Sequence, residues 1–95
     1  LIQFFMQLES LLRAGVPILD TLTDLRDSSD SAAVRQLATD LVDRIETGST
    51  LSEAMSAHPG TFDGLLVGLT SAGEVTGRLP EVIGEMVASL KWQDD

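Results

Sequence analysis

The amino-acid sequence predicts an all-α fold, a single domain built as an antiparallel bundle of six helices. Apolar residues recur every three or four positions in six segments, which is the period of a helix with one buried face. Glycine or proline separates most of these segments, and none shows the alternation of a half-buried strand. A chain of 95 residues is about the size of one domain, so residues 1–95 should share one core.

The first predicted helix covers residues 1–14 and has apolar side chains around most of its circumference, so it should be largely buried. Gly15 is placed to end this helix in a left-handed conformation, and Pro17 suits the first turn of the next helix. The second helix is expected to end near Ser28. Its buried face should carry Ile18, Leu19, Leu22 and Leu25.

The third and fourth helices are predicted from their capping residues. Asp30 or Ser31 can cap the third helix, which Gly48 should end. Thr50 and Glu53 have the spacing of a reciprocal capping box, so a short fourth helix is expected as far as His58. The predicted apolar residues are Val34, Leu37, Ala38, Leu41 and Ile45 in the third helix and Leu51, Ala54 and Met55 in the fourth.

The fifth helix is predicted over residues 62–72, where Gly64, Gly68 and Ala72 repeat every four positions along one face. Small residues at this spacing let another helix approach closely, so we expect Gly68 at a helix–helix contact. Residues 73–77 are predicted to form a loop in which Gly73 and Gly77 can adopt positive φ.

Pro80 should open the last helix. Its predicted inward residues are Leu79, Val82 or Ile83, Met86, Val87 and Leu90. The three methionines, Met6, Met55 and Met86, are expected to fill the core.

The charge balance excludes several classes of partner. Fifteen acidic and six basic residues give a net charge of −9, which repels nucleic acid and anionic lipid surfaces. No stretch of about 18 apolar residues is present to span a bilayer. The absence of cysteine excludes disulfides, thiolate nucleophiles and cysteine-ligated metals.

No catalytic, cofactor or metal site is predicted, because the acidic residues are spread over the outward faces of separate helices. The segment Asp27–Asp30 lacks the glycine and glutamate of a calcium-binding loop. His58, the single histidine, is expected to stabilise a helix C-terminus through the helix dipole. One alternative is an enzyme fragment whose catalytic residues lie elsewhere in a longer chain.

Asp40, Asp43 and Glu46 form the candidate partner-binding surface. They are expected to project together from the exposed face of the third helix, where a basic protein could recognise them. The competing interpretation is a solvated helix face that binds nothing.

Three groups of residues resemble a known family when taken in order. The first group is residues 5–17, with Gly15 and Pro17; the second is residues 48–62, with Gly48 and Glu53; the third is residues 72–79, with Gly73, Glu74 and Gly77. This order and spacing resemble the cytoplasmic F domain of the type II secretion and type IV pilus inner-membrane platform proteins. The resemblance runs from end to end, with modest departures at Thr76 and Pro80.

The resemblance implies a function and a place in a longer protein. A domain of this family is a non-enzymatic scaffold of the bacterial inner membrane, on the cytoplasmic side. It contacts the assembly ATPase and other platform components during polymerisation of pilins or pseudopilins. The resemblance leaves undecided whether the domain forms a homo-oligomer. Residues 90–94 are similar to the segment before the first membrane span, so we expect the first of two such domains, soluble itself within a membrane-anchored parent. The main alternative is an unrelated soluble, acidic helical adaptor.

Overall fold

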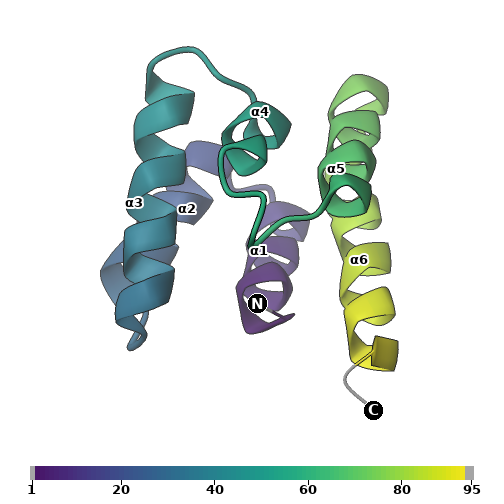
Figure 1. The fold of residues 1–95 in the computed structure, drawn as a ribbon, viewed down its shortest axis with the longest axis horizontal. Helices are drawn as coiled ribbons and strands as arrows, with labels where there is room; N and C mark the ends of the chain where they lie inside the picture. The colour runs from purple at the N-terminus through teal and green to yellow at the C-terminus, as the bar shows by residue number, and fades with distance from the viewer. Residues whose placement is uncertain (1, 94–95) are drawn as a thin grey trace.

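The computed structural model describes residues 2–93, and side chains as far as residue 91. This part of the chain folds into six α-helices and contains no strand, which confirms the all-α prediction (Figure 1). The helices are α1 (Ile2–Arg13), α2 (Ile18–Ser28), α3 (Ala32–Glu46), α4 (Leu51–Ser56), α5 (Gly64–Thr76) and α6 (Leu79–Gln93). Asp94, which the resemblance included, lies outside the described residues.

The helices are arranged as two hairpins on either side of a central pair. Helices α2 and α3 pack together on one side and α5 and α6 on the other, with α1 and α4 between them (Figure 1). Helix α1 packs against α6 and α2, while α4 bridges α3 and α5. None of the described helices combines the length and the apolar character needed to cross a bilayer.

Local signals in the sequence explain most helix ends. The Ser31 hydroxyl accepts the Val34 N–H and caps α3, which decides between Ser31 and Asp30. The capping box at α4 is present as predicted, although α4 ends at Ser56, two residues before His58. Gly77 ends α5 with φ +72°, a left-handed conformation that residues with a Cβ rarely adopt.

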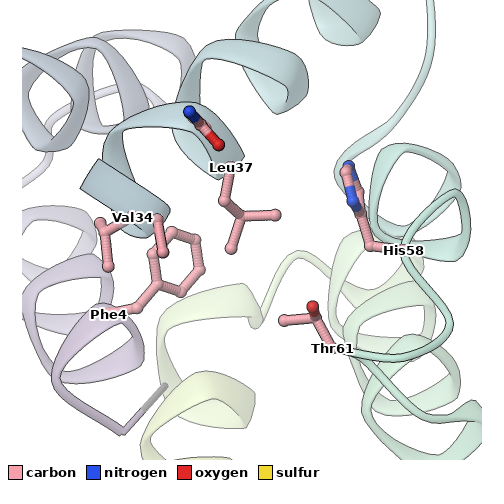
Figure 2. Close-up of a pocket in the computed structure, with 7 residues that line it drawn as sticks. Phe4, Val34, Leu37, His58 and Thr61 are labelled. Atoms are coloured by element: carbon pink, nitrogen blue, oxygen red, sulfur yellow. The ribbon is translucent and has the colours of Figure 1, made fainter. Parts of the chain in front are cut away.

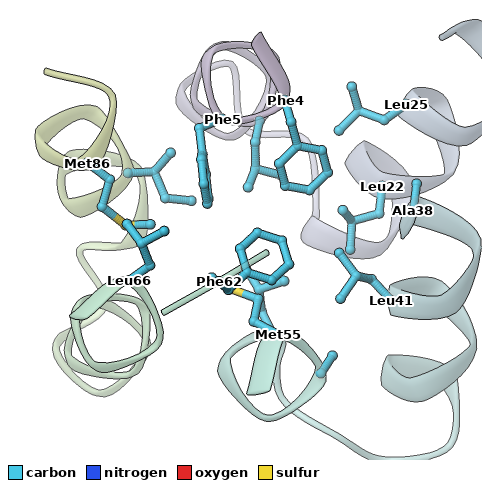
Figure 3. Packing of buried hydrophobic residues seen from close by; sticks show 14 of the residues in the cluster. Phe4, Phe5, Leu22, Leu25, Ala38, Leu41, Met55, Phe62, Leu66 and Met86 are labelled. Carbon is cyan, nitrogen blue, oxygen red and sulfur yellow. The ribbon is translucent and has the colours of Figure 1, made fainter. Parts of the chain in front are cut away.

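The core is built around three phenylalanines. Phe4 and Phe5 of α1 meet Phe62, which lies between α4 and α5, with ring centroids 5.4 to 6.1 Å apart (Figure 3). Edge-on and tilted ring contacts at these distances add to the stabilisation from burial. Buried residues of the other helices surround these rings. Leu22, Leu25, Ala38, Leu41, Met55 and Met86 were predicted to be buried, and Leu66 of α5 joins them (Figure 3).

The predicted boundaries of the fifth helix were wrong at both ends. Phe62 lies outside the helix, because the Asp63 carboxylate accepts the Leu66 N–H and caps α5 one residue later. At the other end, residues 73–76 are helical rather than a loop. Gly73 is a buried helical residue, and of the two predicted loop glycines Gly77 alone has positive φ.

The expected close contact at Gly68 was also wrong. Gly64, Gly68 and Ala72 are exposed, and a Cβ added to Gly68 would meet no atom within 4 Å. The close approaches occur at other glycines. A Cβ on Gly73 would lie 3.1 Å from the Leu79 Cα, and one on Gly84 would lie 2.6 Å from a Glu9 carboxylate oxygen.

Met6 is the one predicted core methionine that the structure leaves at the surface, with 41% of its area exposed. It shares a solvent-facing stripe of α1 with Gln3, Gln7 and Ser10, all exposed. Residues three and four positions apart lie on one face of a helix, so the polar neighbours of Met6 fix its exposure. At the other open choice, Ile83 rather than Val82 is fully buried in α6.

Candidate functional site

The outward face of α3 carries the three predicted partner-binding residues. Ala38, Leu41 and Val42 bury the opposite side of this helix, so Asp43 and Glu46 are exposed to solvent. Asp40 differs from them, because it is half-buried and points toward neighbouring side chains. The expectation that all three carboxylates project together therefore holds for two of them.

Asp40 is the centre of a small ionic cluster. The Arg44 Nε donates to Asp40 Oδ2 at 2.7 Å, and the His58 Nε2 lies 2.5 Å from the same oxygen. A carboxylate can only accept, so this arrangement requires a hydrogen on Nε2. The hydrogen bonds from Arg44 and then from His58 hold the pKa of Asp40 below its ordinary value of 3.8. The Asp40 carboxylate is therefore bonded within the protein through Oδ2.

His58 has a structural partner that the sequence did not reveal. It follows α4, and its ring packs edge-on against Phe62 with centroids 6.5 Å apart. Its side chain hydrogen-bonds to Asp40 on α3, 18 positions earlier, so its contacts extend beyond the end of its own helix. The cluster thus ties the end of α4 to the middle of α3.

The Asp40 cluster predicts a specific pH dependence of stability. A carboxyl group whose pKa is lowered by folding stabilises the protein above its unfolded pKa, and this stabilisation is lost as pH falls through the folded pKa. We expect Asp40→Asn to lower the free energy of unfolding at pH 7 by less than about 1 kcal/mol, since solvent screens this partly exposed group. The difference from the parent should disappear below pH 3.8, in urea titrations across pH 7 to 2.

Asp43→Asn is the matched control, because Asp43 lies on the same helix and makes no ion pair with any side chain that the structure describes. It should change the stability by less than about 0.5 kcal/mol at every pH. The assignment of the cluster would be contradicted if the free energies of unfolding of the parent and of Asp40→Asn differed by the same amount from pH 7 down to pH 2.

A surface pocket of about 370 Å³ opens beside this cluster. Figure 2 shows Phe4 of α1, Val34 and Leu37 of α3, and His58 and Thr61 of the connection between α4 and α5 around it. No local pattern in the sequence marks this pocket, because its walls come from three separate parts of the chain. The arrangement offers an apolar hollow with His58 at its edge.

A second hollow adjoins the pocket across Gln36 and has a mixed charge. Its lining residues are Arg26, Arg35, Gln36, Thr39, Asp40 and Asp43. Asp43 lines this hollow together with Arg26 and Arg35, while Glu46, the last residue of α3, does not line it. The two hollows thus share Gln36 as a common wall residue.

The motif residues of the second and third groups meet at the N-terminus of α4. The Glu74 carboxylate of α5 accepts the Leu51 N–H at 2.9 Å and the Ser52 N–H at 3.4 Å, and the Ser52 hydroxyl donates to it at 2.5 Å. A helix N-terminus has unpaired N–H groups and a partial positive charge, so a carboxylate there is stabilising. Glu74 thereby joins α5 to α4.

Glu53 completes this end of α4 from within the helix. Its carboxylate accepts the Thr50 N–H at 2.9 Å, and the Thr50 hydroxyl accepts the Glu53 N–H. The hydrogen bond from the Thr50 backbone lowers the pKa of Glu53. At the N-terminus of α4, Glu53 therefore accepts the N–H of Thr50, and Glu74 accepts those of Leu51 and Ser52.

The described residues contain no group of three histidine, aspartate or glutamate side chains that could hold a metal ion. Each buried side-chain nitrogen and oxygen in this part of the chain has a hydrogen-bond partner. The polar groups that the structure brings together are thus paired with one another.

Comparison with known proteins places these features in a family. The family model described as "Type II secretion system (T2SS), protein F" matches residues 4–92. The type IV pilus assembly protein TapC of Aeromonas hydrophila is 36% identical over 85 residues, which are 90% of this chain and 20% of TapC. The type II secretion system protein F of Xanthomonas campestris is 30% identical over 91 residues, 96% of this chain and 22% of that protein.

The type IV pilus assembly protein PilC of Myxococcus xanthus is similar as well, at 32% identity over 85 residues. These residues make up 90% of this chain and 20% of that protein. The chain spans about one fifth of the length of the relatives it matches.

Proposed function

The chain belongs to the type II secretion system protein F family, and from this membership we propose that it is a non-enzymatic docking domain of an inner-membrane platform. The platform would assemble type IV pili or the pseudopili of type II secretion. Relatives named for both machines support this proposal. The membership sets aside the alternative of an unrelated helical adaptor.

We further propose that residues 1–95 form one domain of a longer bacterial inner-membrane protein, on the cytoplasmic side. The matched relatives are about five times as long as the aligned segment, so other segments of the parent would supply the membrane anchor. The similarity of residues 90–94 to a segment before a membrane span favours the first of two such domains.

The proposed partners are the assembly ATPase and other components of the platform. The observation that carries this proposal is the pair of exposed carboxylates on α3, Asp43 and Glu46, on a domain with a net charge of −9. A strongly acidic surface steers a basic partner and raises the association rate at low salt. The apolar pocket beside α3 would then bury an apolar side chain of the docked partner.

A double charge reversal tests this proposal. Asp43→Lys with Glu46→Lys should lower the association rate with the cognate assembly ATPase by about tenfold at low salt. The rates of variant and parent should converge near 1 M salt, where the Debye length is about 3 Å. The melting temperature should hardly change, because both side chains are exposed. Asp40 is left in place, since its loss would also break the ionic cluster.

The matched control is Asp20→Lys with Asp24→Lys on α2, which makes the same change in net charge at two other exposed positions. It should slow association less than the α3 variant does. Equal slowing by both variants would show that net charge alone acts, and an unchanged rate in the α3 variant would rule out this face as the docking surface.

A further inference from the structure

A groove between α1 and α3 is formed by two hollows that meet. One is the apolar pocket of about 370 Å³ beside the Asp40 cluster. The other is a polar hollow of about 260 Å³, lined by Gln3 and Gln7 of α1 and by the residues Ser28–Ser31. Phe4 and Val34 line both hollows, so the two form one continuous depression, called here the α1–α3 groove.

One end of the α1–α3 groove is apolar. Figure 2 shows Phe4, Val34 and Leu37 on one side of the pocket, with His58 and Thr61 across from them. Val34 and Leu37 are half-buried, so the pocket leaves part of their apolar surface in contact with water. Filling such a hollow with an apolar side chain removes this surface from water and is favourable.

The other end of the groove offers one negative charge. Asp30 is the charged residue among the described residues that line the polar hollow, and it is exposed. It makes no ion pair with any side chain that the structure describes. The nearby arginines have other partners, since Arg26 donates to Asp27 and Arg35 donates to the Ser29 carbonyl. A cation from outside the domain is therefore the complement of this end.

The side-chain amides of the polar hollow suit a polypeptide. Gln3 and Gln7 are exposed and lie one helical turn apart on α1, along one wall of the hollow. Each amide both donates and accepts hydrogen bonds, as does each peptide unit of a bound segment. A purely apolar ligand would leave these amides and Asp30 without partners.

We propose that the α1–α3 groove takes a segment of a partner protein that carries one large apolar side chain and a nearby lysine or arginine. The apolar side chain enters the pocket, and the cation reaches Asp30. Ser31 and Leu37 are about 9 Å apart along α3, a distance that an extended segment covers in about three residues. The choice of a protein as the occupant rests on the proposed docking function, whereas the chemistry of the segment rests on the groove.

Random peptides of about twelve residues displayed on phage are the probe for this proposal. They are selected on the immobilised parent chain and counter-selected on Ala33→Phe, because Ala33 is exposed at the pocket and a phenylalanine there fills it. Ala32→Phe is the matched control, since Ala32 is exposed on the same helix and lines neither hollow. The selected peptides should bind Ala33→Phe about tenfold more weakly than the parent or Ala32→Phe.

The sequences of the selected peptides and the effect of salt test the polar end. The peptides should share a large apolar residue with a lysine or arginine within about four positions. In fluorescence anisotropy, Asp30→Lys should weaken binding of a synthetic consensus peptide about fivefold at low salt, and the difference should vanish near 1 M salt. Asp20→Lys makes the same change in net charge on α2, outside the groove, and should weaken binding less than about twofold.

The groove assignment would be overturned by a selection that yields no binding peptides, by peptides without the basic residue, or by equal binding to the parent and Ala33→Phe. Failure of the docking proposal looks different. In that case the parent chain binds the consensus peptide but not the assembly ATPase. Conversely, an ATPase that binds the parent and Ala33→Phe equally well, with no peptide selected, would remove the groove assignment and leave docking through the α3 carboxylates in place.

Discussion

Replacement of Phe62 by alanine is expected to lower the free energy of unfolding by about 3–5 kcal/mol, the usual cost of removing a buried aromatic ring. Phe62 is 1% exposed and contacts the rings of Phe4 and Phe5 at the centre of the core. A domain of this size has about 5–15 kcal/mol of total stability, so this one change should remove a large part of it. Its position outside any helix excludes a loss of helix propensity as the cause.

Urea denaturation followed by circular dichroism measures this loss. Leu65→Ala is the control, because it removes a large apolar side chain that is mostly exposed and should cost less than about 1 kcal/mol. Similar stabilities for the two variants would mean that Phe62 does not occupy the core.

Replacement of Glu74 by alanine should lower the free energy of unfolding by about 1–3 kcal/mol, because it leaves two N–H groups at the N-terminus of α4 without their acceptor. The Leu51 and Ser52 N–H groups would lose their carboxylate partner. The Ser52 hydroxyl, which also donates to Glu74, belongs to a buried residue. Glu74→Gln should show a smaller loss, since an amide oxygen still accepts but carries no charge.

Glu85→Ala on α6 removes the same side chain from an exposed position and should change the stability by no more than about 0.5 kcal/mol. Thermal melts of Glu74→Ala, Glu74→Gln, Glu85→Ala and the parent measure these differences in stability. If Glu74→Ala and Glu85→Ala had the same melting temperature, the carboxylate of Glu74 would not be holding α4 in place.

The sequence predicted those features of the fold that depend on neighbouring residues. Thr50 and Glu53 stand three positions apart, and their capping box needs nothing from the rest of the chain. The same is true of the positive φ at Gly15 and Gly77, although Gly77 ends α5 and does not lie in the predicted loop. The apolar periodicity in turn identified the buried faces of most helices.

Features that depend on distant residues could not be predicted in this way. A glycine such as Gly73 suits both a turn and a close helix contact, and the packing of Leu79 and Val82 against it decides between them. Spacing showed that Gly68 could admit another helix but not whether this domain supplies one. The hydrogen bond between Asp40 and His58 spans 18 positions, so no local pattern marks it.

The family motif gains a physical explanation from these contacts. Glu53 and Glu74 satisfy the N-terminus of α4, and α4 leads directly to His58, which is paired with Asp40 on α3. The motif residues therefore hold the helices that surround the apolar pocket. In the proposed docking, the exposed carboxylates of α3, which lie outside the motif, would recognise the partner.

The most direct test of the proposed docking is a nuclear magnetic resonance titration of the isotope-labelled chain with the unlabelled assembly ATPase. We expect signals of the backbone amides in residues 39–47 of α3 to shift or broaden first, together with those that line the pocket, such as His58. Changes confined to α5 and α6, or no change with any component of the platform, would contradict the assignment of this surface.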